Sequence, residues 1–379
     1  MNAYPVRHCK RCVLPSTKPG LLIDDEGVCS ACRQVERKKL IDWDAREAEL
    51  AALCDSIRGK NGNGYDCIVP VSGGKDSTYQ VWVMSKVHGL KVLAVNVVAH
   101  LQTREGIHNL NAMVEHLNVD LIKVNVRPTT LKKIRNSAFF KIGNPNWAEH
   151  RVIFAAVART ALLYHVPLVA WGEDIAVEFG GNRAKSVTQE GSAEELINND
   201  LFREATLEDL LGTDVRPSEL LFYMHPDKDE LKRRGIRSIY LGHYRWWDGT
   251  KHYLKAKEFG FRPRREGPLS GNILDYDNID EKLCEVNIWF KFLKHGFWRP
   301  HDQSCYKIWN GYMSREEAVE LIHAKQYEFP IEYFQEYLEY HEMTERQFRD
   351  NEDKWRNPRL WHQVNGEWRL RYPIEQLVE

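Results

Sequence analysis

The chain lacks both a long apolar run and a strong net charge. No segment of its 379 residues approaches the ~20 consecutive apolar residues that span a bilayer. Its N-terminus, MNAYPVRHCKRC, has no apolar core of the kind that signal peptides carry. A formal net charge of -1 argues against a surface built for bulk nucleic-acid binding and leaves room only for a local basic groove. We therefore expect a cytoplasmic protein with no membrane role and no nucleic-acid partner.

A Walker A loop is also missing. That loop requires a glycine five residues before its Gly-Lys pair and Ser or Thr directly after the lysine, and this chain has Val69 and Asp76 at those places. Instead, an apolar run over residues 67–71 breaks into SGGKDS, and a helix-like pattern follows over residues 75–88. Glycines at a strand-to-helix turn let successive N–H groups point at one anion. The segment therefore predicts a phosphate-binding loop of another kind.

This strand-turn-helix segment resembles the pyrophosphate loop of the PP-loop ATP pyrophosphatase superfamily, whose pattern is SGGxDS after a buried strand. The resemblance implies that ATP is split into AMP and pyrophosphate. The implied ATP-binding residues are Ser72, Gly73, Gly74, Lys75, Asp76, Ser77 and Asn96, the last near the adenosine. Lys75 and Asp76 are also catalytic candidates, with Asp76 a candidate magnesium ligand. The competing interpretation is an ordinary Ser-Gly-Gly turn.

Strand-like and helix-like patterns alternate along the middle of the chain, which predicts an α/β fold with a doubly wound parallel sheet. The expected strands are residues 67–71, 91–98, 120–126, 167–171 and 237–242, and the expected helices between them include 105–117, 130–140 and 147–164. The superfamily resemblance implies the adenine nucleotide alpha hydrolase-like form of this fold. In such sheets, ligands bind at the carboxyl ends of the strands.

The end of the fourth expected strand carries a second group of candidates. Gly172 allows close approach of a ligand, which makes it an ATP-binding candidate. Glu173 and Asp174 can hold magnesium directly or through water, and we include both among the catalytic candidates. The competing interpretation is a surface turn with two solvated acids.

Two CxxC pairs near the N-terminus predict a zinc ribbon. Cys9 and Cys12 are separated from Cys29 and Cys32 by sixteen residues, a spacing that places four thiolates around one Zn²⁺. Such a site is closed and structural, and redox CxxC chemistry is the alternative. We expect three units. They are a zinc ribbon with its connecting helix (1–58), a PP-loop domain (59–275) and a helical C-terminal region (276–379).

Charged and aromatic residues late in the chain are weaker candidates. Arg245 stands in an aromatic cluster, HYRWW, that either stacks on a sugar or base or packs inside the protein. Charges also gather around the turn at Gly296. As candidates for binding a charged sugar nucleotide or an adenylate we name Arg245, Lys291, Lys294, Arg299 and Asp302.

Several motifs together resemble the N-acetyl sugar amidotransferase family of lipopolysaccharide and O-antigen biosynthesis. They are CxxCVLP, DxxGVCSAC, SGGKDS, GED and KFLKHGFWRPHDQSCYKIWNGYMSREEA. The resemblance implies that ATP adenylylates an acetamido group of a nucleotide sugar and that ammonia then gives an acetamidino group. It also implies ATP, Mg²⁺ and structural Zn²⁺ as cofactors.

The source of ammonia is expected to be a partner. A glutaminase with an N-terminal nucleophile needs Cys directly after the initiator, and residue 2 is Asn. The resemblance implies a glutaminase subunit and a cyclase-like channel subunit similar to those of imidazole glycerol phosphate synthase. The rival hypothesis is a tRNA 2-thiolation-type sulfurtransferase of the same superfamily, because those enzymes also pair a zinc ribbon with a PP-loop.

Overall fold

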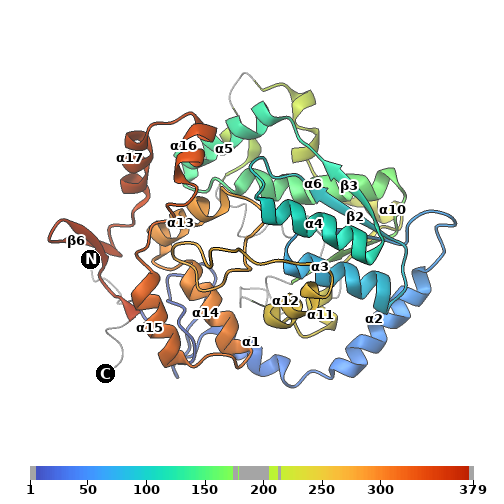
Figure 1. Cartoon of the computed structure of the whole chain (residues 1–379), viewed down its shortest axis with the longest axis horizontal. Helices are drawn as coiled ribbons and strands as arrows, with labels where there is room; N and C mark the ends of the chain where they lie inside the picture. The colour runs from blue at the N-terminus through green and yellow to red at the C-terminus, as the bar shows by residue number, and fades with distance from the viewer. Residues whose placement is uncertain (1–5, 174–177, 179–204, 212–214, 375–379) are drawn as a thin grey trace.

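The computed structural model describes residues 6–173, 178, 205–211 and 215–374. Within these residues, a five-stranded parallel sheet runs in the order β3-β2-β1-β4-β5 (Figure 1). The strands are β1 (Cys67–Pro70), β2 (Val92–Val97), β3 (Asp120–Val124), β4 (Leu168–Trp171) and β5 (Arg237–Tyr240). β1 lies in the centre, where the chain order reverses, so the loop that follows β1 lies at the topological switch point.

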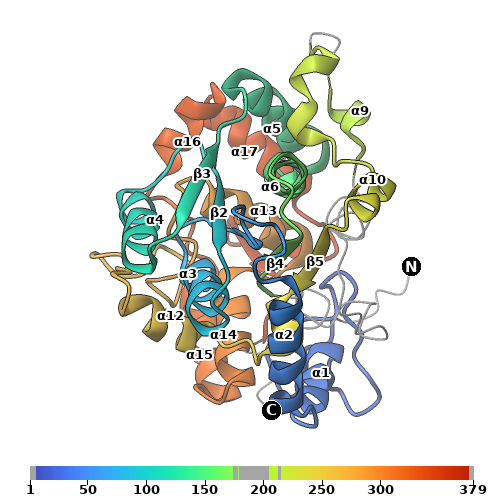
Figure 2. The same cartoon turned by 90° about the vertical axis from the view of Figure 1, so that its right-hand side faces the viewer.

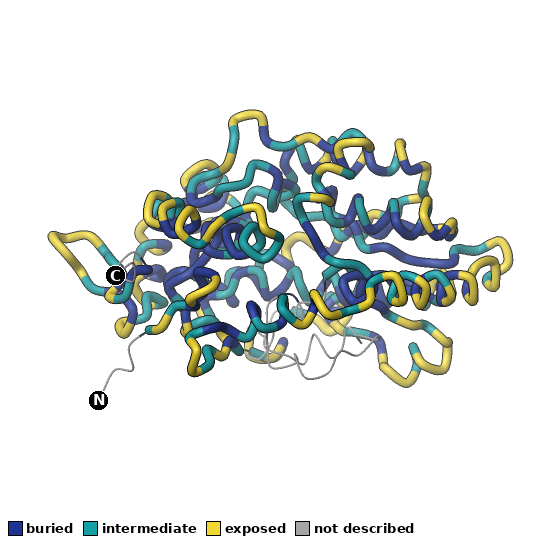
Figure 3. The backbone as a smooth tube through the Cα atoms, turned by 90° about the horizontal axis from the view of Figure 1, so that it is seen from below, coloured by how far each residue is buried: buried dark blue, intermediate teal, exposed yellow. Residues whose placement is uncertain are grey.

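Helices cover both faces of the sheet (Figure 2). They are α2 (Trp43–Ile57), α3 (Lys75–Trp82), α4 (Arg104–Leu117), α5 (Pro128–Ile142) and α6 (Trp147–Leu163). Side chains alternate along β1, so Ile68 packs with α5 and α6 while Val69 packs with α2 and α4. The three inner strands β1, β2 and β4 are almost wholly buried, whereas the edge strands β3 and β5 are partly exposed (Figure 3).

The remaining elements are short helices near the sheet and a mostly helical C-terminal region. The former are α1 (Ser30–Lys38), the π-helical turn η1 (Val83–Val87), α9 (Leu207–Leu210), η2 (Pro217–Glu219), η3 (Leu221–Tyr223), α10 (Lys228–Arg233), α11 (Leu241–Tyr244) and α12 (Gly249–Lys257). The latter are α13 (Cys284–His295), α14 (Arg299–Trp309), α15 (Arg315–Lys325), α16 (Phe334–His341), α17 (Glu345–Trp355), β6 (Trp361–Val364) and β7 (Glu367–Leu370).

The predicted fold class is confirmed. The structure has a doubly wound parallel sheet, an N-terminal cysteine cluster and a mostly helical C-terminal region. Two details differ from expectation. The helix expected over residues 75–88 changes to π-helical geometry at Val83, and the C-terminal region contains the antiparallel hairpin β6–β7. The limits of the three expected units stay a prediction. No helix in the described ranges has the length and apolar character to cross a bilayer.

Candidate functional site

The SGGKDS segment forms a tight loop between β1 and α3. Gly73 has φ +95°, and a Cβ on it would lie 2.6 Å from the carbonyl oxygen of Gly106 on α4, so both its conformation and its space require glycine. Hydroxyl groups close the loop. The amide of Ser72 donates to Ser77 Oγ at 3.4 Å, and the amide of Gly74 donates to Ser72 Oγ at 3.3 Å. These contacts, with Ser77 Oγ donating to the carbonyl of Gly74 at 3.1 Å, hold the loop at the start of α3, where a helix N-terminus favours an anion.

A network of charged groups lies at this loop. Lys75 Nζ donates to Asp76 Oδ2 at 3.0 Å and to Asp277 Oδ1 at 2.5 Å. Burial lowers the pKa of Lys75, but Asp277 and Asp76 outweigh it and leave that pKa above its ordinary value. For Asp76, burial raises the pKa, but Lys75 and His252 outweigh burial and leave the pKa below its ordinary value, so the carboxyl stays ionised. The loop thus holds one ammonium between two carboxylates.

Two residues far along the chain complete this network, and sequence reasoning missed both. His252 on α12 hydrogen-bonds through Nδ1 to Asp76 Oδ1 at 2.7 Å, and its ring stacks on Tyr79 at a 4.0 Å centroid distance. Asp277 precedes α13 in the acidic stretch DYDNIDE. A single histidine and one aspartate among several give no local pattern, so only the tertiary arrangement identifies them.

Contacts with α4 position Asp277. The amide of Thr103 donates to the carbonyl of Asp280 at 3.1 Å, and the Thr103 side chain caps α4 by accepting from the amide of Gly106 at 2.9 Å. A Cβ on Gly106 would lie 2.5 Å from Asp280 Cα, so this glycine lets the segment approach α4 closely. The same α4 turn packs against Gly73, which brings the loop and the Asp277 segment together.

Glu173 belongs to the same electrostatic environment. Its pKa is raised to about 8, first by burial and then by repulsion from Asp76 and Glu178, with Lys75 acting in the opposite direction. A carboxyl with this pKa can take up or release a proton near neutral pH. Asp174, its expected companion, lies outside the described residues.

Asn96 and Gly172 lie at the carboxyl ends of β2 and β4. Asn96 is 2% exposed and donates from Nδ2 to the carbonyl of Val71 at 2.7 Å. Its Oδ1 has no hydrogen-bond partner in the described part of the chain, which leaves a buried acceptor beside the loop. A Cβ on Gly172 would lie 2.4 Å from Gln80 Nε2 and 2.9 Å from the Trp247 ring. Packing against Gln80 and Trp247 therefore explains the glycine at this position, with or without a bound ligand.

The weaker candidates fall into two groups. Arg299 lies at the site, because its Nη2 is 3.7 Å from Asp277 Oδ2. Arg245 reaches the edge of the site, because its Nη1 donates at 3.2 Å to the hydroxyl of Tyr79, whose ring stacks on His252. The other contacts of these candidates lie elsewhere. Arg245 pairs with Glu47 at 2.6 Å, Lys291 pairs with Asp302 at 2.5 Å, and Lys294 donates to the carbonyl of Ile142 at 3.1 Å. Their role in substrate binding stays a prediction.

The aromatic cluster near Arg245 packs inside the protein. Trp247 is buried and meets His252 edge-on at 4.4 Å between ring centroids. Trp246 donates from Nε1 to Asn310 Oδ1 at 2.7 Å. Of the two interpretations of this cluster, packing therefore accounts for both tryptophans, and Trp247 acts by holding the His252 ring against Tyr79.

The four N-terminal cysteines form one buried cluster. Their sulfur atoms lie within 4.8 Å of one another, with Cys9 to Cys32 at 3.8 Å and Cys12 to Cys29 at 3.6 Å. Four sulfurs ~2.3 Å from one tetrahedral ion would be about 3.8 Å apart, so the donor set fits a single Zn²⁺. Arg315 Nε donates at 3.2 Å to the carbonyls of Cys9 and Cys12, which ties the cluster to α15. A metal here would be closed off and structural.

The fold and the loop define a doubly wound α/β protein with an SGGKDS loop between β1 and α3. Residues 242–373, about a third of the chain, match the family described as LPS biosynthesis protein WbpG-like, C-terminal domain. This matched segment supplies both His252 and Asp277. Part of the candidate site therefore lies in the segment that matches this family. No curated protein matches the chain.

Three solved structures are weakly similar to this chain. NMN synthetase from Francisella tularensis has 20% identity and a TM-score of 0.29, over 51% of this chain and 82% of that one. NH3-dependent NAD synthetase from Campylobacter jejuni subsp. jejuni has 14% identity and a TM-score of 0.28, over 59% and 99%. U34-tRNA thiolase NcsA from Methanococcus maripaludis, with its [4Fe-4S] cluster, has 16% identity and a TM-score of 0.30, over 80% and 85%. Similarities this weak carry no functional argument.

Proposed function

We propose that this chain is an ATP-dependent, AMP-forming amidotransferase that converts an N-acetyl group of a nucleotide-linked sugar into an acetamidino group. The observation that carries the proposal is the contact between Lys75 of the ATP-type loop and Asp277 of the WbpG-like segment, at 2.5 Å. The proposed ATP-binding loop and the segment that matches the WbpG-like family thus both contribute residues to one charged cluster. The product would serve O-antigen or another surface polysaccharide.

In this proposal, the loop between β1 and α3 holds the phosphates of ATP. The donors are the loop amides, the hydroxyls of Ser72 and Ser77, and Lys75, which turns from Asp277 and Asp76 towards the triphosphate. The buried acceptor Asn96 Oδ1 would face the adenosine, since it has an unused lone pair beside the loop. Magnesium would be held by Asp76 and Asp174 and would offset charge on the leaving pyrophosphate.

The reaction has two displacements. The acetamido oxygen of the sugar attacks the α-phosphorus of ATP, and the bond to the β-phosphate oxygen breaks to release pyrophosphate. Ammonia then attacks the former carbonyl carbon, and the C–O bond breaks to release AMP, which retains the acetamido oxygen. The attacking nitrogen loses a proton, and Glu173 is the group with a suitable pKa near the loop. Lys75 and Arg299 would stabilise negative charge during both displacements.

Ammonia fits this site better than sulfur does. The cysteine nearest the Asp277 segment is Cys284, whose sulfur accepts from Asn278 Nδ2 at 3.2 Å. Burial raises the pKa of Cys284 well above its ordinary value, which disfavours the thiolate that sulfur transfer needs. We therefore prefer amidation to the rival tRNA thiolation. Ammonia would come from a glutaminase subunit, with a cyclase-like channel subunit between the two.

The test is an assay of purified protein with ATP, Mg²⁺, ammonium and a panel of UDP- and CMP-linked N-acetyl sugars. We expect pyrophosphate and AMP in equal amounts, and one sugar whose mass falls by ~1 Da as oxygen is replaced by NH. Omission of either ammonium or the sugar should stop product formation. Absence of pyrophosphate with every sugar would refute the proposal, whereas tRNA-dependent AMP release with sulfur transfer would establish the rival.

A further inference from the structure

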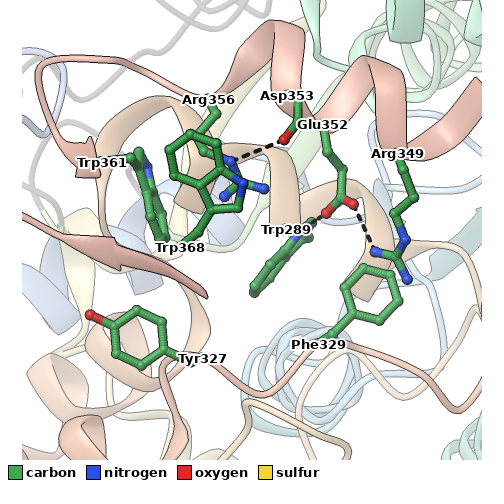
Figure 4. A pocket seen from close by; sticks show the side chains of 9 residues that line it. All are labelled: Trp289, Tyr327, Phe329, Arg349, Glu352, Asp353, Arg356, Trp361 and Trp368. Carbon is green, nitrogen blue, oxygen red and sulfur yellow. Dashed lines mark hydrogen bonds and ion pairs between the residues drawn. The ribbon is translucent and has the colours of Figure 1, made fainter. Parts of the chain in front are cut away.

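A cavity of about 380 Å³ lies in the C-terminal region (Figure 4). Its walls come from α13, the segment after α15, α17 and the hairpin β6–β7. The lining residues are Trp289, Tyr327, Phe329, Arg349, Glu352, Asp353, Arg356, Trp361 and Trp368. Figure 1 places α17 and β6 at the left end of the long axis and α3 to the right of the centre, and none of the loop-site residues lines this cavity. The cavity is therefore separate from the loop between β1 and α3.

Hydrogen bonds and ring contacts preform the aromatic walls. Trp361 Nε1 donates to the carbonyl of Leu293 at 2.9 Å, and Trp289 Nε1 donates to Glu352, which is 4% exposed. The guanidinium of Arg356 lies 5.1 Å from the Trp361 ring and 4.7 Å from the Trp368 ring. Since these side chains already hold one another, a ligand would meet fixed aromatic surfaces at little ordering cost.

The cavity has a buried floor and an open rim. Trp361 is 2% exposed and Trp289 is 7% exposed, so both rings lie at the floor. Asp353 lies at the rim, with 63% of its side chain exposed. Trp368 is partly buried, and its partner in the hairpin register is Gln363, on the same face as Trp361. A volume of about 380 Å³ lies within the range of small-molecule sites.

The charges in the cavity balance. Arg349 Nη1 donates to Glu352 Oε2 at 2.7 Å, and Arg356 Nε lies 3.4 Å from Asp353 Oδ1, so each cation has a carboxylate partner. A phosphate group would meet these two carboxylates, and a purely apolar ligand would leave the remaining N–H and carboxylate positions unpaired. A ligand with an apolar face and several hydroxyl groups suits both the rings and the ion pairs.

We propose that this cavity binds a neutral sugar ring, with its C–H face on the tryptophans and its hydroxyls on Arg356 and the carboxylates. This second carbohydrate site does not rest on the reaction at the loop. It would hold a sugar unit that carries no phosphate, away from the point where ATP is cleaved.

The test is saturation-transfer NMR on the full chain, with glucose and N-acetylglucosamine at millimolar concentration as probes. We expect a transfer signal from the ring protons of at least one sugar. Trp368→Ala should weaken binding about tenfold, because it removes one aromatic wall. Asp353→Ala, at the exposed rim, should weaken it severalfold without threatening the fold. The matched control is Val364→Ala, which is exposed and lies on the other face of the same hairpin.

Three results would overturn the proposal. The first is no transfer signal from either sugar. The second is equal binding by the Trp368→Ala, Asp353→Ala and Val364→Ala variants. The third is a signal that disappears in Asp277→Asn but persists in Trp368→Ala, because the sugar would then occupy the loop site. If UMP binds in a way that depends on Trp368 and neither sugar binds, the cavity is a nucleotide site and the sugar proposal is wrong.

Discussion

The loop site and the aromatic cavity represent two ways of building a binding site from one chain. The loop site concentrates its donors in six consecutive residues, 72–77, and adds charged partners from distant segments. The cavity takes its nine lining residues from segments spread between residues 289 and 368, and aromatic rings form most of its walls. The comparison shows why sequence can reveal a candidate phosphate loop and miss an aromatic cavity. A phosphate loop needs a local backbone conformation, whereas an aromatic cavity needs only tertiary packing.

The largest effect should follow from removal of the loop ammonium. Lys75→Met should lower the rate of pyrophosphate release by at least about 10²-fold, because a positioned positive donor at the phosphates is lost. Steady-state assays at saturating ATP measure this rate. The matched control is Lys86→Met on the adjoining η1, whose exposed side chain leaves the loop unchanged. Equal rates in the two variants would show that the loop does not act on ATP.

Neighbouring glycines of the loop offer a sharper comparison. Gly73→Ala should destabilise the protein by about 2 kcal/mol or more, because φ of +95° disfavours an L-residue and the new Cβ would contact the carbonyl of Gly106. Gly74→Ala should change stability by less than about 1 kcal/mol, since Gly74 has φ -78° and its Cβ would lie 3.3 Å from Ser72 Oγ. Urea unfolding of both variants measures the difference. A Gly74→Ala variant as unstable as Gly73→Ala would contradict this loop geometry.

The smallest expected effect concerns the proton on Glu173. This carboxyl titrates near 4.5 when unfolded and near 8 when folded. Between these values the folded chain binds more protons, so the native protein loses stability as the pH rises through that window. Glu173→Gln does not titrate. It should therefore match the native protein below pH 4.5 and exceed its stability above pH 8. The full shift corresponds to ~5 kcal/mol, and solvent screening of the partly buried Glu173 reduces the expected gain to about 1–2 kcal/mol.

Chemical unfolding in the presence of a chelator tests this pH dependence, because a bound metal would change the charge near Glu173. A stability difference between Glu173→Gln and the native chain that is the same at low and high pH would contradict the raised pKa. The exposed Glu115→Gln on α4 serves as the control.

Much of the fold could be predicted from sequence. The five expected strands all appear, with ends that shift by at most two residues, because buried parallel strands are continuous apolar runs bounded by turns. The hairpin β6–β7 was missed. Each of its strands has only four residues, so the alternation of apolar and polar residues is too short to distinguish a strand from the end of a helix. The change at Val83 to π-helical geometry was missed for a similar reason, because apolar spacing does not specify one extra residue in a turn.

The candidate site could be predicted only where its chemistry is local. SGGKDS and the two CxxC pairs are patterns that a few adjacent residues define, and both form compact clusters. His252 and Asp277 reach the loop from 176 and 202 residues away in sequence, so no local signal marks them. Lys291 and Asp302 are predicted from charge density alone; they form an ion pair with each other, and their role in substrate binding stays a prediction.

The central claim is that ATP activates the acetamido oxygen of a sugar, and an isotope experiment tests it most directly. The purified protein would be given ATP, Mg²⁺, ammonium and a nucleotide sugar whose acetamido oxygen is ¹⁸O, and the products would be separated by mass spectrometry. The account predicts that AMP carries the label and that the sugar loses it as the acetamidino group forms. Unlabelled AMP beside a sugar that keeps its ¹⁸O would contradict the account.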